Sequence, residues 1–222
     1  MTDLTLTAAD GHILGAYRAD PSGTPRGGIV VIQEIFGVNS HIRSVCDRLA
    51  EAGYVAIAPA LFDRVEPNFQ SGYSSKEVEH ARTFMANPDW DGYMNDTDAA
   101  RAVAAEAGKV GIIGFCLGGA VAFLAAARYE GFSAASGFYG ARIPAFADEK
   151  PHCPVQLHYG ELDQGIPMSN VDEVRAKRPE CDIYVYEGAG HGFNCDVRGS
   201  YDPAAAKKAW ARSMDLFGQH IG

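Results

Sequence analysis

Residues 109–120 constrain the fold of this chain more than any other stretch. They begin with a short apolar run that has the length of a buried strand, and they pass into an alanine-rich segment, 120–128, that favours a helix. A Gly-x-Cys-x-Gly turn joins the two. A chain that changes from strand to helix within two residues strains the middle residue, and Gly114 and Gly118 provide the room that this close approach needs. The pattern predicts a nucleophile elbow, with Cys116 at the bend where such turns usually carry serine.

The position of Cys116 between a strand and a helix gives its sulfur a particular electrostatic setting. Unpaired backbone N–H groups and the positive end of the helix dipole favour a thiolate over a thiol at that place. The sequence therefore predicts a reactive cysteine. The alternative is an inert core residue, because an isolated cysteine in an apolar run behaves as a small hydrophobic side chain.

The length and composition of the chain fit one domain that covers residues 1–222, with 47% hydrophobic and 21% charged residues. The formal net charge of −9, with no basic cluster to offset it, excludes nucleic acid and anionic membranes as general partners. A local arginine can still attract a small anion. We therefore expect a small-molecule substrate, and a monomer or a weak homo-oligomer.

The amino-terminal residues and the cysteines indicate the compartment. Residues 1–10 are polar and carry no basic segment, and no apolar run reaches membrane-spanning length, so we expect a cytoplasmic protein. An odd number of cysteines without a Cys-x-x-Cys pair fits reduced thiols better than a disulfide framework or a zinc site. The cysteines are Cys46, Cys116, Cys153, Cys181 and Cys195.

Segments typical of strands alternate with segments typical of helices along the chain. The expected strands are 4–7, 13–17, 28–32, 54–58, the run before Cys116, 133–139, 155–159 and 183–186, and the expected helices are 40–52, 75–85, 93–107, 120–128, 169–177 and 203–217. The pattern predicts an α/β fold with a mostly parallel sheet and helices on both faces. Ligands of such sheets bind beyond the carboxyl ends of the strands. Four residues with useful chemistry reach that edge: Glu34, Cys116, Asp163 and His191.

Cys116, Asp163 and His191 follow one another in the order nucleophile, acid and histidine, which is the order of an α/β-hydrolase triad. In this interpretation Cys116 attacks a carbonyl carbon, His191 takes and returns a proton, and Asp163 orients the imidazole. Taken singly, Asp163 could instead cap a loop. His158 lies inside an apolar run and is expected to be a core residue, and no spacing of ligand residues on one element predicts zinc.

Five motifs, spread over nearly the whole chain, carry a resemblance to a known family. They are residues 33–39 (QEIFGVN), 114–119 (GFCLGG), 138–140 (FYG), 160–163 (GELD) and 188–193 (GAGHGF). Through these motifs the sequence resembles the dienelactone hydrolase (carboxymethylenebutenolidase) family of the α/β-hydrolase superfamily. The resemblance implies a cysteine hydrolase of lactones or small esters, with a dienelactone-like substrate, a thioester acyl-enzyme, and no metal or cofactor.

The resemblance also implies that Glu34 lies near the nucleophile and helps to convert a protected thiol into the attacking thiolate. A buried carboxylate there would accept a proton, with a basicity that changes when substrate arrives. The alternative for Glu34 is an ion pair with an arginine. Elbows of this kind form an oxyanion hole from backbone N–H groups, here those of Leu117 and Ile35. Three aromatic residues are expected to line the pocket, unless they serve packing alone: Phe36, Tyr139 and Phe193.

The sequence departs from the family at the residues that bind the substrate carboxylate. Members that act on the dienelactone carry an arginine four residues after the catalytic histidine, where this chain has Cys195. A second arginine of the family falls near Glu79 or His80 here. Three arginines could take over from nearby: Arg82, Arg142 and Arg198. Because a bidentate arginine–carboxylate contact is strong and selective, its loss would shift preference toward neutral esters or toward acids of another shape.

Two other functions fit the same residues. The protein could bind a small molecule without turning it over, because a fold does not fix a function. It could also be a redox-sensing protein, in which Cys195 approaches Cys116 and forms a disulfide with it.

Overall fold

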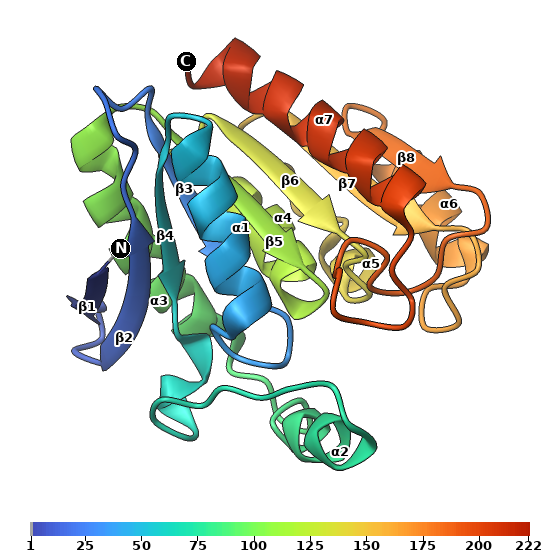
Figure 1. Cartoon of the computed structure of the whole chain (residues 1–222). Coiled ribbons are helices and arrows are strands. Elements are labelled where there is room, and N and C mark those ends of the chain that lie inside the picture. The colour runs from blue at the N-terminus through green and yellow to red at the C-terminus, as the bar shows by residue number, and fades with distance from the viewer. Residues whose placement is uncertain (1) are drawn as a thin grey trace. The chain divides into compact units, whose positions relative to one another are not determined.

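The structure is a computed structural model that describes residues 2–222 (Figure 1). Within these residues eight strands belong to one sheet, and most of the strand pairs are parallel. This confirms the predicted α/β class. The chain divides into two compact units, one up to residue 111 and the other from residue 112 to 222. That residues 1–222 form one domain stays a prediction.

The first unit contributes four strands in the spatial order β1-β2-β4-β3. β1 pairs antiparallel with β2, and β2 with β4, whereas β3 and β4 are parallel. The elements are β1 (Thr2–Thr7), β2 (Ile13–Ala19), β3 (Gly28–Ile32), α1 (Ser40–Glu51), β4 (Val55–Pro59), the 3₁₀ helix η1 (Leu61–Arg64), α2 (Ser75–Thr83), α3 (Trp90–Ala104) and the 3₁₀ helix η2 (Ala105–Ala107). Every residue of β3 and β4 is buried, as expected for strands that are covered on both faces.

Helices cover both faces of the strands in the first unit. α1 packs on β4 and lies in front of the strands in Figure 1, while α3 packs on β3 and β4 from behind. The buried side of α1 carries Ile42, Val45 and Leu49, whose spacing of three and four residues places them on one helix face. Asn39 caps this helix, because its side-chain oxygen accepts a hydrogen bond from the backbone N–H of Ile42.

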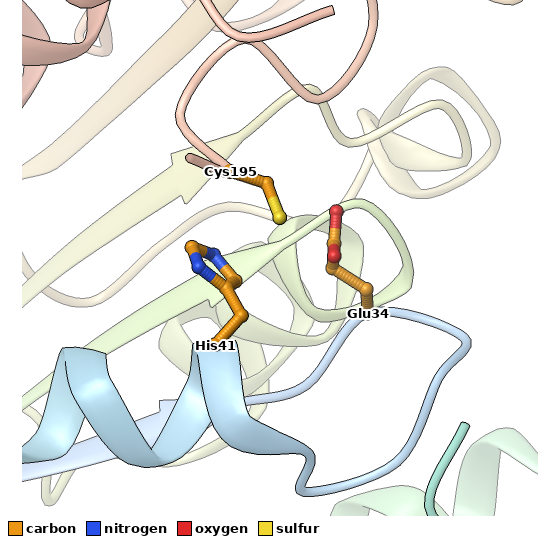
Figure 2. A group of neighbouring side chains, drawn as sticks. All are labelled: Glu34, His41 and Cys195. Atoms are coloured by element: carbon orange, nitrogen blue, oxygen red, sulfur yellow. The ribbon is translucent and has the colours of Figure 1, made fainter. Parts of the chain in front are cut away.

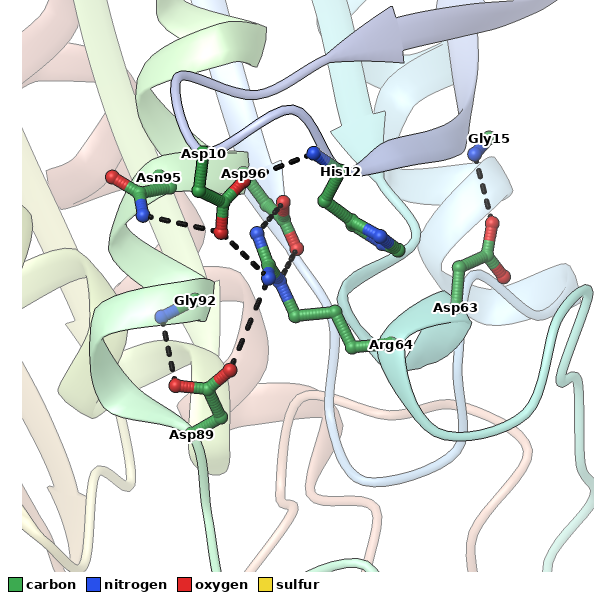
Figure 3. Close-up of polar contacts among 9 residues, drawn as sticks. All are labelled: Asp10, His12, Gly15, Asp63, Arg64, Asp89, Gly92, Asn95 and Asp96. Atoms are coloured by element: carbon green, nitrogen blue, oxygen red, sulfur yellow. Dashed lines mark hydrogen bonds and ion pairs between the residues drawn. The ribbon is translucent and has the colours of Figure 1, made fainter.

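An ion-pair cluster ties three parts of the first unit together (Figure 3). Arg64, the last residue of η1, forms two hydrogen bonds with Asp96 of α3, at 2.8 and 2.7 Å. The same guanidinium contacts Asp10 in the turn between β1 and β2, at 2.8 Å, and Asp89 at the start of α3, at 3.9 Å. The cluster therefore joins the hairpin turn, η1 and α3 through a single side chain.

The second unit begins within β5 (Val110–Phe115) and contributes the strand order β5-β6-β7-β8. The further elements are α4 (Leu117–Arg128), β6 (Ala134–Phe138), α5 (Ile143–Phe146), β7 (Val155–Gly160), α6 (Met168–Lys177), β8 (Asp182–Tyr186) and α7 (Pro203–His220). The pairs β6/β7 and β7/β8 are parallel. α7 packs on the front of β6 and β7 in Figure 1, and α4 packs on the same strands from behind.

Three of the differences between the expected and the observed elements concern helices. α3 begins at Trp90 and not at Tyr93, because Asp89 caps it by accepting a hydrogen bond from the Gly92 N–H at 3.0 Å. Two short helices lie where the sequence predicts none: α5 between the expected strands 133–139 and 155–159, and η1 between the expected strand 54–58 and the expected helix 75–85. No helix among residues 2–222 combines the length and the apolar character that crossing a membrane requires.

Candidate active site

The turn between β5 and α4 places Cys116 in a strained backbone conformation. Its φ of 55° and ψ of −110° lie outside the regions that a residue with a side chain usually adopts. A backbone hydrogen bond of 3.0 Å from the Cys116 N–H to the Phe138 carbonyl fixes the bend against β6. A Cβ added to Gly114 would overlap the Gly118 carbonyl oxygen, so the close approach of strand and helix requires glycine there. This is the elbow geometry that the sequence predicts.

Cys116, His191 and Asp163 form a continuous chain of contacts within the second unit. His191 Nε2 lies 3.2 Å from Cys116 Sγ, and His191 Nδ1 lies 2.7 Å from Asp163 Oδ2. The Asp163 side chain is fully buried, and its other oxygen accepts a hydrogen bond of 2.8 Å from the Gly165 N–H. Each side chain of the set is therefore oriented by its neighbour.

The contacts of His191 with Cys116 and Asp163 favour a protonated imidazole. Burial alone would lower the pKa of His191, but the Cys116 sulfur and the Asp163 carboxylate outweigh it and raise the pKa to about 10. Nε2–H then points toward Sγ while Nδ1–H donates to the carboxylate. With Nε2–H facing Sγ, the imidazolium stabilises negative charge on the sulfur once the thiolate has formed.

The loop that carries His191 is held against the end of β7. The backbone N–H of Leu162 donates to the Ala189 carbonyl at 2.9 Å, and the Gly188 N–H donates to the Glu161 carboxylate at 3.0 Å. A Cβ on Gly160 would lie 2.5 Å from the Ala189 carbonyl oxygen, so the close approach of the two segments requires glycine at the end of β7. This packing brings the histidine loop and the aspartate loop together.

One of the expected pocket aromatics lies beside the imidazole, and a second packs against the first. The ring of Tyr139 is 5.1 Å from that of His191, and the ring of Phe193 is 5.4 Å from that of Tyr139. Both aromatic side chains are buried, which also agrees with a packing role. The backbone of Tyr139 has a φ of 39° and donates to the His158 carbonyl at 2.7 Å. His158 itself is buried and bonded through Nδ1 to the Tyr186 hydroxyl at 2.9 Å, as a core histidine would be.

Cys195 and Arg198 follow His191 in the same loop. Cys195, which by the family resemblance takes the place of an arginine, is fully buried. Its side chain is drawn in Figure 2. Arg198 is half-buried, and its guanidinium lies against Gly192, where an added Cβ would be 2.5 Å from Nη1. Of the three candidate arginines, Arg198 is therefore the one that packs next to the residue after His191.

The other candidate arginines occupy exposed positions. Arg142 lies at the start of α5. Arg82 lies on α2 and lines a cavity of about 540 Å³, together with Tyr73, Val78 and Glu79.

Glu34 lies in the loop after β3, and His41 projects from the first turn of α1 (Figure 2). Glu34 is buried, with 1% of its surface exposed, and the Tyr73 hydroxyl donates to its Oε2 at 3.4 Å. Phe36 in the same loop packs edge-on against Tyr73, with ring centroids 4.7 Å apart. Tyr73 was not among the residues predicted from the sequence; the only signal for it is its place in the long stretch between the expected strand 54–58 and the expected helix 75–85, since long irregular segments often flank binding sites.

The fold, with the strand–turn–helix at Cys116, is the α/β-hydrolase fold. An esterase from Pyrococcus furiosus shares this fold, with a TM-score of 0.73 and 15% sequence identity. The match covers 100% of this chain and 93% of the esterase chain. A match to the model of the dienelactone hydrolase family extends over residues 14–221, and the chain belongs to that family.

Individual relatives agree with this assignment. A Synechocystis protein named "Putative carboxymethylenebutenolidase" is 36% identical over 224 residues, which cover 92% of this chain and 91% of the relative. A crystal structure of a Klebsiella pneumoniae protein, named "Putative Dienelactone Hydrolase", matches with a TM-score of 0.83 and 30% sequence identity. The match covers 99% of this chain and 100% of the Klebsiella chain. The protein is an enzyme that hydrolyses lactones or esters.

Proposed function

We propose that the protein hydrolyses dienelactone-like lactones or small carboxylic esters, with Cys116 as nucleophile, His191 as general acid and base, and Asp163 as the group that orients the imidazole. The observation that carries the proposal is the pair of contacts to His191, 3.2 Å from Nε2 to Sγ and 2.7 Å from Nδ1 to Oδ2. The strained elbow supports it, because strain of this kind collects at functional sites.

Acylation begins when Sγ forms a bond to the carbonyl carbon and the carbonyl oxygen takes up the negative charge. In our proposal the backbone N–H groups of Leu117 and Ile35 bind that oxygen. The bond between the carbon and the leaving oxygen then breaks, and the leaving oxygen receives the proton from His191 Nε2. In a lactone the leaving oxygen stays attached to the acyl group that Cys116 carries as a thioester.

Deacylation uses the same groups in reverse. A water molecule attacks the thioester carbon while His191 Nε2 takes its proton, and Sγ leaves as a thiolate. The product is a carboxylic acid, which in the lactone case also carries the new hydroxyl group. Because the pKa of His191 is raised to about 10, the imidazolium is available as an acid at neutral pH.

Glu34 has a separate proposed role, as a proton acceptor that helps to convert a protected thiol into the attacking thiolate. Its burial supports this role, because a buried carboxylate changes its basicity when its surroundings change. We further propose that Phe36, Tyr139 and Phe193 line the substrate pocket, and that Arg198 is the best placed of the candidate arginines to meet a substrate carboxylate.

Two substitutions and one control test the proposal with a small aryl ester and a dienelactone. Cys116→Ala and His191→Ala are each expected to abolish turnover while the circular dichroism spectrum is retained. Cys153→Ala is the matched control, because burial raises the pKa of that thiol to about 12 and keeps it unreactive. Unchanged rates in either site variant would refute the assignment.

Mass spectrometry separates catalysis from the other two functions. An acyl adduct on Cys116 that forms and then clears supports hydrolysis. A ligand that leaves chemically intact would instead indicate a binding protein, and a disulfide between Cys116 and Cys195 under mild oxidant would indicate a redox sensor.

A further inference from the structure

The buried carboxylate of Glu34 is met by a donor that the sequence did not reveal. The Tyr73 hydroxyl donates to Oε2 at 3.4 Å, across 39 positions of sequence. A carboxylate that is 1% exposed depends on such donors for its orientation, because water is excluded from most of its surface.

The direction of this hydrogen bond is set by Asn39. The side-chain oxygen of Asn39 accepts from the Ile42 N–H at 3.3 Å, so its amide nitrogen faces the other way and donates to the Tyr73 hydroxyl oxygen at 3.1 Å. A hydroxyl group carries one hydrogen, and with its oxygen already accepting, that hydrogen is directed to the carboxylate. The start of α1 thus determines which way the Tyr73 hydroxyl points.

The backbone around Tyr73 is fastened to the loop that carries Glu34. The Ser71 N–H donates to the Phe36 carbonyl at 3.0 Å, and the Asn39 amide donates to the Ser71 carbonyl at 3.1 Å. Gly37 and Gln70 form an isolated antiparallel bridge beside them. Backbone bonds and the edge-on ring contact with Phe36 hold Tyr73 in place independently of its hydroxyl.

We propose that Tyr73 is a positioning residue for the hydrolysis: its hydroxyl, oriented by Asn39, holds the Glu34 carboxylate in the orientation from which it accepts the thiol proton. The inference rests on the proposed role of Glu34. Tyr73 touches neither thiol nor acyl group in this scheme and acts only through Glu34. Tyr73 also lines the cavity on α2.

Tyr73→Phe removes the hydroxyl and keeps the ring that packs on Phe36. Hydrogen bonds to charged groups are strong enough that we expect kcat and the rate of Cys116 alkylation by iodoacetamide to fall by about 10- to 10²-fold. KM and the thermal midpoint are expected to change little. Tyr17→Phe is the matched control, because it removes a hydroxyl bonded to Asp47 at 2.7 Å and should leave both rates unchanged.

Asn39→Asp tests the direction of the hydrogen bond without removing the cap of α1. The carboxylate keeps an acceptor for the Ile42 N–H, since aspartate and asparagine are equivalent caps, but it offers no donor to Tyr73. The Tyr73 hydrogen then turns toward position 39 and leaves Glu34. We expect the loss seen in Tyr73→Phe, and little additional loss when the two substitutions are combined.

Glu34→Gln completes the cycle and separates the two levels of the proposal. If Glu34→Gln leaves kcat and alkylation unchanged, the proposed role of Glu34 fails, and the inference fails with it. If Glu34→Gln is slow but Tyr73→Phe matches the wild type, only the inference is overturned. A Tyr73→Phe loss that persists in full in the Glu34→Gln background would also overturn it, because Tyr73 would then act by another route.

Discussion

Replacing Arg64 with methionine tests how strongly the ion-pair cluster stabilises the first unit. Arg64 and Asp96 are joined by two parallel hydrogen bonds of 2.8 and 2.7 Å, and their side chains are 13% and 0% exposed. Methionine keeps much of the aliphatic length of arginine. It leaves the Asp96 carboxylate buried without the guanidinium that neutralises it.

The expected loss follows from this burial. Removing one partner of a buried ion pair costs about 3–5 kcal/mol, because the remaining charge is uncompensated. For a chain of this length each kcal/mol shifts the thermal midpoint by about 2–4 °C, so a decrease on the order of 6–20 °C is expected. Losses of that size are a large part of the roughly 5–15 kcal/mol that stabilises a typical domain.

The loss should also depend on pH. Burial raises the pKa of Asp96 and Arg64 opposes that rise, so removing Arg64 raises the pKa further. A carboxyl group whose folded pKa exceeds its unfolded value of about 3.9 binds its proton more tightly in the native state. The penalty for ionising it is absent at low pH and grows as pH rises through the raised pKa. The deficit of Arg64→Met is therefore smaller at pH 5 than at pH 8.

Thermal and urea unfolding at both pH values measure these effects. The double variant Arg64→Met, Asp96→Leu should be more stable than Arg64→Met alone, because it buries no charge. Arg175→Met is the control: its pair with Asp172 is 48% and 66% exposed, and the change should stay within about 0.5 kcal/mol. An Arg64→Met deficit below about 1 kcal/mol, or one that the second substitution does not relieve, would refute the reasoning.

Three further outcomes are expected. Because the pKa of His191 is raised to about 10, kcat/KM should stay level through neutral pH and fall as pH rises through about 10; a descending limb near 6.5 in the pH–rate profile would contradict this. Asp163→Asn should lower kcat by about 10²–10⁴-fold in steady-state assays with little change in unfolding midpoint, because the amide no longer holds the imidazole in its working tautomer. Gly114→Ala should lose about 1–3 kcal/mol in urea unfolding, since the new Cβ overlaps the Gly118 carbonyl oxygen, whereas Gly23→Ala, with open space around it, should be neutral.

The elbow was predictable because its constraints are local. A buried strand, a turn and a helix follow one another within a few residues, and Gly114 is needed for a contact only four positions away. The order of Cys116, Asp163 and His191 is equally visible, since each follows a strand of the kind that a parallel sheet requires. Sequence alone could not give the distances between them, because these depend on how β5, β7 and β8 stand relative to one another.

Contacts between residues far apart in the sequence could not be predicted from the sequence pattern. The hydrogen bond from Tyr73 to Glu34 spans 39 positions, and the one from Arg64 to Asp96 spans 32, and neither leaves a periodic pattern. Each depends on a loop conformation that tertiary packing decides. The early start of α3 was, by contrast, readable in principle, since Asp89 is a common capping residue.

Arg198 shows why the sequence position of a charge does not settle specificity. The family resemblance implies that Cys195 stands where members that act on the dienelactone carry an arginine, and hence a preference for neutral esters or for acids of another shape. Yet the chain curls after His191: the Cys195 N–H donates to the Gly192 carbonyl at 2.9 Å, and the Arg198 N–H donates to the Cys195 carbonyl at 3.1 Å. These turns return the guanidinium to the face of Gly192, whose φ of 77° and missing side chain make the approach feasible. The Arg198 guanidinium thus lies beside Gly192 in the histidine loop, although Arg198 is three residues further along the chain than Cys195. Two substrate preferences were considered, neutral esters and substrates that carry a carboxylate. We therefore propose the second: esters or lactones whose carboxylate lies at a different place relative to the reacting carbonyl.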